Sequence, residues 1–213
     1  MYLIFAYNYN ILITFLYIYL YKFYNDFVNL ELIQLNFYLL KLFIYIPTFI
    51  NTYDKNIYLD FINNSKQNEE IIDVINYNLF DYFNDILILV IKEDYVMIIH
   101  HIITSFLLYF IKYNEFHHIT LLTLLLFQLS SPYLSIAKIF KHQNKKRYAY
   151  ISFGIFASIF LICRIIYFTF VVYQCIFNKY YKTYQYYYIN SFILSIYYLQ
   201  IYWMRKIFRI IKF

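Results

Sequence analysis

The sequence is poor in charged residues, glycine, proline and cysteine. Charged side chains make up 14% of its 213 residues, whereas soluble domains carry about 25%. The single glycine, Gly154, cannot form the glycine-rich loops that hold phosphates or dinucleotides. The two cysteines, Cys163 and Cys175, both lie in apolar stretches, which excludes a disulfide framework and a cysteine-based zinc site. These deficits exclude an ordinary soluble domain.

Long apolar runs take the place of charge. Hydrophobic residues make up 63% of the chain, and runs near 20 residues match a hydrocarbon core about 30 Å thick at 1.5 Å per residue. We therefore predict an all-α, multi-pass transmembrane bundle of about seven helices. The first span has no basic n-region or small-residue cleavage site, which favours a retained helix over a cleaved signal peptide. The expected spans are 2–21, 32–53, 76–91, 95–111, 116–137, 148–177 and 186–204.

Lysine and arginine cluster after the fifth and seventh spans, which puts both clusters on one side of a seven-span bundle. By the positive-inside rule that side is the cytoplasm, and we interpret the basic residues as topology signals rather than as a nucleic-acid surface. The N-terminus is then lumenal and the C-terminus cytoplasmic. The acidic 54–75 loop, with its Asn63-Asn64-Ser65 sequon, faces the lumen. The basic residues are Lys138, Lys141, Lys145, Lys146, Arg147, Arg205, Lys206, Arg209 and Lys212.

Several polar side chains fall inside the predicted spans, where they are costly unless they face the protein interior or a wet cavity. The rise per residue places His100 and His101 about 8–9 Å inside the membrane, with Ser131 at about 9 Å and Gln128 at about 13 Å. These similar depths predict a cavity that opens toward the cytoplasmic leaflet. The polar set is Lys41, Asp81, Asp85, His100, His101, Gln128, Ser130, Ser131 and Arg164.

The adjacent histidines are the chemically most capable members of this set. On a helix they point about 100° apart, so one imidazole can face the cavity while a neighbouring hydrogen bond fixes the other. An imidazole there can act as a base toward an amine or hydroxyl, or as a nucleophile toward an activated acyl group, with Asp85 setting its tautomer. The residues alone leave a second interpretation open, in which both histidines are neutral and hydrogen-bond between helices.

Two other charged groups inside the spans also have expected roles. Lys41 is expected to snorkel to the cytoplasmic surface, and Arg164 is expected to form a structural ion pair with Asp85 or Asp81. No metal ion or cofactor is expected. The second histidine pair, His117-His118, lies at the lumenal end of its span, too far from the first pair to share a haem.

Several motifs resemble the TLC-domain family of membrane proteins, which includes the ceramide synthases. The resemblance begins with Tyr82-Phe83-Asn84-Asp85 and continues through the segment from Asp94 to Thr104 that holds the histidine pair. It covers roughly residues 30–213 and implies a TLC domain there, preceded by an N-terminal transmembrane helix and turn over residues 1–29. The later motifs are Gln128-Leu129-Ser130-Ser131-Pro132-Tyr133-Leu134, Arg164, and Gln200-Ile201-Tyr202-Trp203-Met204 before a basic tail.

The resemblance also implies site residues. It assigns catalytic roles to His100, His101 and Asp85. In ceramide synthases, the positions that correspond to Gln128 and Ser131 hold acids thought to belong to the active site, and both are neutral here. The segment looks more like the Glu-Leu-Ser-x-Pro of the TLC-domain-containing proteins of lipid homeostasis, although Gln128 again replaces the acid. The residues expected to bind the substrate are Thr104, Gln128, Ser131 and Arg164.

Three functions follow as expectations. The first is a lipid-binding or lipid-processing protein of the endoplasmic reticulum or a connected membrane, with a role in membrane lipid homeostasis. The second is an N-acyltransferase that makes ceramide from acyl-CoA and a long-chain (sphingoid) base. The third is a lipid sensor or chaperone without chemistry. The neutral Gln128 and Ser131 weigh against acyl transfer, so the sequence leaves open whether the protein is an enzyme.

Overall fold

The computed structural model describes residues 27–52, 69–113, 117–177 and 184–211, together with residues 8, 11, 12, 14–16, 18 and 19 of the first predicted span. All elements within these ranges are helical, so the prediction of an all-α, multi-pass helical bundle is confirmed. They are α2 (Phe27–Thr52), α4 (Glu69–Ile91), α5 (Tyr95–Lys112), α6 (His117–His142), α7 (Lys146–Phe160), the π-helical segment η1 (Leu161–Ile166), α8 (Tyr167–Phe177) and α9 (Tyr184–Ile211).

The helices follow the predicted spans in order and differ from them at their ends. Segments α7, η1 and α8 continue without a break and correspond to the predicted span 148–177. Helix α4 begins inside the predicted 54–75 loop, because Glu69 and Glu70 in its first turn interact favourably with the helix dipole. Most of the first predicted span and the rest of that loop, including its sequon, lie outside the described residues.

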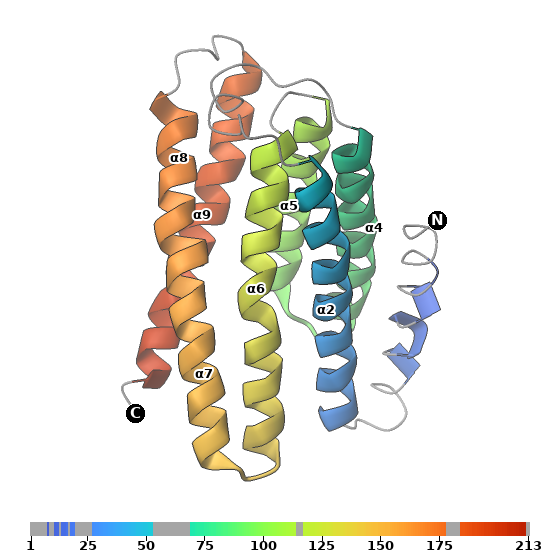
Figure 1. Cartoon of the computed structure of the whole chain (residues 1–213), viewed down its shortest axis with the longest axis vertical. Helices are drawn as coiled ribbons and strands as arrows, with labels where there is room; N and C mark the ends of the chain where they lie inside the picture. The colour runs from blue at the N-terminus through green and yellow to red at the C-terminus, as the bar shows by residue number, and fades with distance from the viewer. Residues whose placement is uncertain are drawn as a thin grey trace.

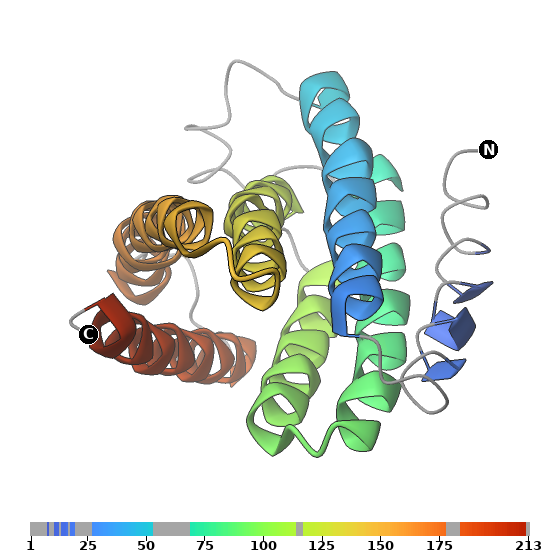
Figure 2. The same ribbon diagram turned by 90° about the horizontal axis from the view of Figure 1, so that it is seen from below.

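Five of the described helical segments are long and apolar enough to cross a membrane, namely α2, α4, α5, α6 and the continuous α7–α8 segment. These segments make the chain an integral membrane protein. Helix α9 is 28 residues long but is not among the five, because its tyrosine, glutamine and asparagine residues lower its hydropathy. It nevertheless packs against α5 and α8 within the bundle (Figures 1 and 2).

Successive membrane-length segments run in opposite directions, so the chain turns at the two ends of the bundle (Figure 1). The turns at 92–94 and 143–145 lie at the same end, where α2 begins and α9 finishes. Helix α6 packs against α2 on one side and α7 on the other (Figure 2). We call the end with the two turns the basic end, because it carries Lys141, Lys145, Lys146, Arg147, Arg205, Lys206 and Arg209.

A buried ion pair joins α2 to α4. The Nζ atom of Lys41 pairs with Oδ2 of Asp81, and the two residues are only 3% and 1% exposed. About one turn further along both helices, Tyr45 Oη of α2 donates a hydrogen bond to Asn78 Oδ1 of α4. The Asn78 amide in turn donates to the carbonyl oxygen of Val74 at 2.8 Å. The expectation that Lys41 snorkels is therefore wrong, because a carboxylate on the adjacent helix holds its amine inside the bundle.

We expect Lys41→Met to lower the free energy of unfolding by about 3–5 kcal/mol, because it leaves a buried carboxylate without its cation. Asp81→Leu should cost a similar amount, and the double variant should recover most of the loss. The free energy can be measured by unfolding the full chain from detergent micelles. The control is Lys141→Met, which changes an exposed lysine at the basic end. Additive losses in the double variant would contradict a direct pair.

Candidate functional site

The two histidines of α5 have different surroundings. The His101 ring lies edge to face with the Tyr82 ring, with centroids 4.8 Å apart, and His101 Nδ1 is 3.7 Å from Asp85 Oδ2 on α4. The His100 ring contacts the Trp203 ring of α9 edge to face at 4.9 Å. Adjacent residues on a helix diverge by about 100°, which separates the two imidazole centroids by 5.5 Å. One histidine therefore faces α4 and the other faces α9.

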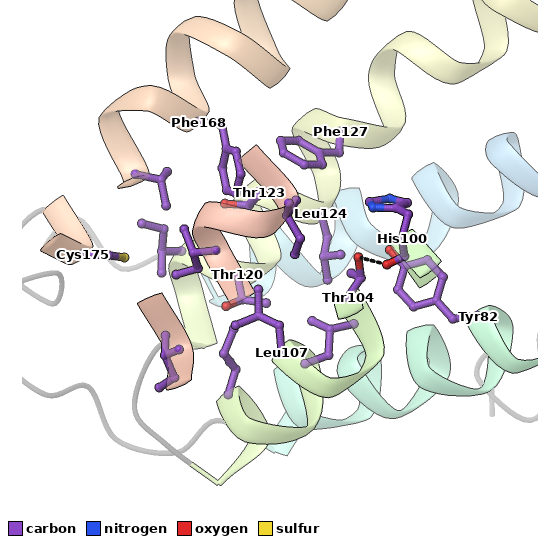
Figure 3. Close-up of a pocket in the computed structure, with 17 residues that line it drawn as sticks. Tyr82, His100, Thr104, Leu107, Thr120, Thr123, Leu124, Phe127, Phe168 and Cys175 are labelled. Atoms are coloured by element: carbon purple, nitrogen blue, oxygen red, sulfur yellow. Dashed lines mark hydrogen bonds between the residues drawn. The ribbon is translucent and has the colours of Figure 1, made fainter. Parts of the chain in front are cut away.

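An apolar cavity begins at His100 and runs between α5, α6, α8 and α9 (Figure 3). Its empty volume is about 690 Å³, counted out to and including the space at its open side. Tyr82, His100 and Thr104 lie at one end, and Cys175 lies at the other (Figure 3). The wall between them is mainly apolar and includes Leu107, Leu108, Leu124, Phe127, Phe168, Val171, Ile193 and Ile196.

This cavity extends away from the basic end. It follows α5 from His100 to Ile111, and its other walls continue to Ile119 on α6 and Ile189 on α9. We predicted a cavity that opens toward the basic end and is shared by both imidazoles, but this cavity runs the other way and only His100 of the pair lines it. The reason is that a separate apolar cluster fills the space between α7 and the basic end of α9. Its buried members are Phe156, Ala157, Phe160, Met204 and Ile207.

Arg164 lies on the π-helical segment η1 and reaches across to α6. Its Nη2 atom donates to the carbonyl oxygen of Phe127 at 2.6 Å and to Ser131 Oγ at 3.0 Å. The Cζ atom lies 5.3 Å from the Phe127 ring centroid and 5.1 Å from that of Phe160, which adds cation–π attraction. A π-helical turn changes the helical register locally and is frequent at functional sites. Here the π-helical segment carries the guanidinium that is bonded to α6.

The ion pair predicted between Arg164 and Asp85 or Asp81 is wrong. Among the residues that the structure describes, the guanidinium makes no salt bridge with a carboxylate. The carboxylate of Asp81 is paired with Lys41, and that of Asp85 faces His101. Arg164 therefore joins η1 to α6 rather than to α4, and one wall residue of the cavity, Phe127, supplies both a carbonyl oxygen and a ring to it.

The remaining predicted site residues lie beside these groups. Thr104 lines the cavity, and its Oγ1 donates to the carbonyl oxygen of His100 at 2.8 Å. Gln128 is buried, and its Oε1 has no hydrogen-bond partner in the described part of the chain. Most of the predicted residues thus form three groups: His100 with Thr104 in the cavity, His101 of α5 with Asp85 of α4, and Arg164 of η1 with Ser131 of α6. Within the described ranges, no cluster of three His, Cys, Asp or Glu side chains can hold a metal ion.

The sequence analysis quoted three further residues in its motifs without predicting them as site residues. Tyr82 lines the cavity and contacts His101, and Trp203 contacts His100. Aromatic residues make up 26% of the chain, so no single ring stands out in the sequence. Gln200 is 0% exposed. It could have been found by the same rule that selected the histidines, because it is a polar side chain inside a predicted span.

Comparisons with known proteins agree on one family. The family model of the TLC domain matches residues 8–209. A segment of 125 residues, 54% of this chain, is 33% identical to ASC1-like protein 3 of Oryza sativa subsp. japonica and covers 44% of that protein. A segment of 79 residues, 37% of this chain, is 38% identical to ceramide synthase LOH2 of Arabidopsis thaliana and covers 27% of it. The matches thus span less than half of these curated relatives, and no solved structure matches significantly.

We expect Arg164→Lys to lower the melting temperature of the full chain, because an ammonium group cannot replace a planar guanidinium that stacks on two rings and bonds to α6. Ser131→Ala removes only one of its two acceptors and should cost about 1 kcal/mol. Thermal unfolding in detergent, followed by intrinsic fluorescence, measures both. The matched control is Arg205→Lys, an exposed arginine at the basic end. Equal melting temperatures for the two lysine variants would contradict this contact.

Proposed function

This chain belongs to the TLC-domain family, and we propose that it binds a membrane lipid in the cavity and processes that lipid at His100. The family relationship supports a lipid-related membrane function in general terms. The finer assignment rests on the cavity, whose apolar wall suits an acyl chain and whose polar end suits a head group.

The single observation that carries the proposal is the position of His100 at the end of a mainly apolar cavity. His100 is 9% exposed, and its Nδ1 has no hydrogen-bond partner within the described residues, so this nitrogen is available to a ligand. The cavity follows α5 from His100 to Ile111, which is about 16 Å at 1.5 Å per residue. That length is close to half of a hydrocarbon core about 30 Å thick, the depth that one leaflet's acyl chains occupy.

The proposed chemistry uses the two imidazoles differently. His100 meets the lipid head and serves as a base toward a hydroxyl or amine, or as a nucleophile toward an activated acyl carbon. His101 does not line the cavity, and its nearest ionisable partner is Asp85 at 3.7 Å. His101 Nδ1 makes no hydrogen bond within the described residues, so Asp85 acts on it as a nearby charge. We assign the His101–Asp85 pair to positioning, because a neighbouring carboxylate orients an imidazole electrostatically.

A second function, ceramide synthesis, is favoured by the match to a relative named a ceramide synthase. In that reaction the amine of a long-chain base attacks the thioester of acyl-CoA, an amide forms, and the thiol of CoA leaves. His100 would accept the proton that the amine loses. Ceramide synthases carry acids at the positions that correspond to Gln128 and Ser131, and both residues are neutral here. Ceramide synthesis is therefore less well supported than the broader lipid-processing function. A lipid sensor without chemistry is the third candidate.

We expect a line that lacks this protein to show an altered membrane lipid profile that wild type restores and His100→Ala does not. The reason is that this substitution removes the basic group that faces the cavity. Lipidomics on the null line, complemented with wild type, His100→Ala or His101→Ala, measures the effect. The control is His142→Ala, which changes an exposed histidine at the end of α6.

The outcome separates the candidates. A selective fall in ceramide that only wild type and the control restore would favour acyl transfer. A broad change in phospholipid acyl chains with the same pattern of rescue would favour the wider lipid-processing function. Broad changes that His100→Ala restores as well as wild type would favour a sensor and would overturn a role for this imidazole.

We also propose that the protein resides in the endoplasmic reticulum or a connected membrane with its basic end in the cytoplasm, because positive-inside asymmetry sets the orientation of multi-pass proteins. A protease-accessible tag after Phe213 is then expected to be cleaved in sealed microsomes, and the Asn63 sequon is expected to be glycosylated. An Asn63→Gln variant controls for the sequon. Protection of the tag together with an unglycosylated sequon would invert the orientation.

A further inference from the structure

Gln200 is a fully buried amide on α9, about one turn beyond Ile196, the last residue of that helix that lines the cavity. It is 0% exposed. Ile193 and Ile196 of the same helix line the cavity, and Trp203 contacts the His100 ring. At about 100° per residue, Gln200 falls in the same narrow sector of the helix as these three residues. It therefore lies between the last cavity-lining turn of α9 and the turn that touches His100.

Neither polar atom of this side chain is satisfied by the protein. Both Oε1 and Nε2 of Gln200 lack a hydrogen-bond partner in the described part of the chain. Burial of an unpaired amide is costly, and buried polar groups without any partner are uncommon in native proteins. Helix packing alone would be served as well by leucine or methionine at this position. An amide with a free donor and a free acceptor beside a cavity indicates a polar ligand group.

We propose that Gln200 is a specificity-determining residue that binds the polar head of the lipid in the cavity. Its carboxamide offers two N–H donors and one carbonyl acceptor and carries no charge. The complementary head carries both a donor and an acceptor, as an amino alcohol or a primary or secondary amide does. A head that only accepts hydrogen bonds leaves the Gln200 oxygen unpaired. This inference rests on the proposed function, because it assumes that a lipid occupies the cavity.

The geometry assigns different tasks to the two polar groups at this end of the cavity. His100 has one nitrogen free and can exchange a proton. Gln200 cannot exchange a proton at neutral pH, so it can hold a head group but cannot act on it. The lipid head would thus be oriented by an amide from α9 while its reacting atom meets the imidazole from α5.

The test compares two probes of equal chain length on the purified full chain in detergent micelles. The first probe, 2-aminohexadecan-1-ol, has a head with donors and acceptors, and the second, 1-methoxyhexadecane, has an acceptor only. Binding is measured as the rise in melting temperature with probe concentration. Wild type is expected to prefer the amino alcohol, and Gln200→Met is expected to reduce that preference about tenfold, the equivalent of one to two hydrogen bonds. The control, Gln143→Met, changes an exposed residue in the turn after α6.

A second readout distinguishes ligand binding from helix packing. Without probe, Gln200→Met is expected to raise the melting temperature, because it removes an unpaired buried amide. A lower melting temperature, or failure to fold, would assign the amide to packing and overturn the inference. Gln200→Asn, which withdraws the amide by one methylene, should fold and show an intermediate preference.

The two proposals fail in different ways. If wild type binds neither probe, the proposed lipid site fails. If wild type binds both probes and Gln200→Met keeps the full preference for the amino alcohol, only the role of Gln200 is overturned.

Discussion

In a hydrocarbon environment each polar side chain needs a partner inside the bundle, and this constraint determines how the helices are joined. Lys41 and Asp81 join α2 to α4 through a buried ion pair. Lys138 donates to Glu31 at 2.9 Å and joins α6 to α2. Arg164 joins η1 to α6 through a carbonyl and a hydroxyl. Because each of these charged groups needs a partner inside the bundle, these polar contacts constrain which faces of the helices meet.

The cavity lies in a part of the bundle where the helices face each other mainly through apolar side chains. Between α5, α6, α8 and α9 the wall residues are mostly aliphatic or aromatic, and no ion pair among the described residues crosses the space. Membrane helices gain little from expelling lipid from one another, since lipid tails are as apolar as leucine. A space with an apolar wall can therefore hold an acyl chain at low cost. The polar side chains at its end, His100 and Thr104, make that space chemically asymmetric.

The sequence predicted the helices and the polar residues well, because both depend on composition and on the rise per residue. It did not predict which polar side chains pair with each other. Whether Asp81 pairs with Lys41 or with Arg164 depends on helix rotation, and a shift of one residue turns a side chain by about 100°. The π-helical register of η1 alters that rotation locally and was not predicted from the sequence. The direction of the cavity depends on which aromatic side chains fill the basic end, and a chain so rich in tyrosine and phenylalanine gives little contrast between them.

The two adjacent histidines have different neighbours, because His101 contacts Tyr82 of α4 and His100 contacts Trp203 of α9. Consecutive residues on a helix point about 100° apart, so the pair can place one imidazole at the cavity and the other against a neighbouring helix. Tyr82 connects the two, because it lines the cavity beside His100 and its ring contacts His101. A change at the His101–Asp85 contact would therefore reach the cavity wall through the Tyr82 ring. In this arrangement α4 contributes a single side chain to the cavity wall, and that side chain also contacts His101.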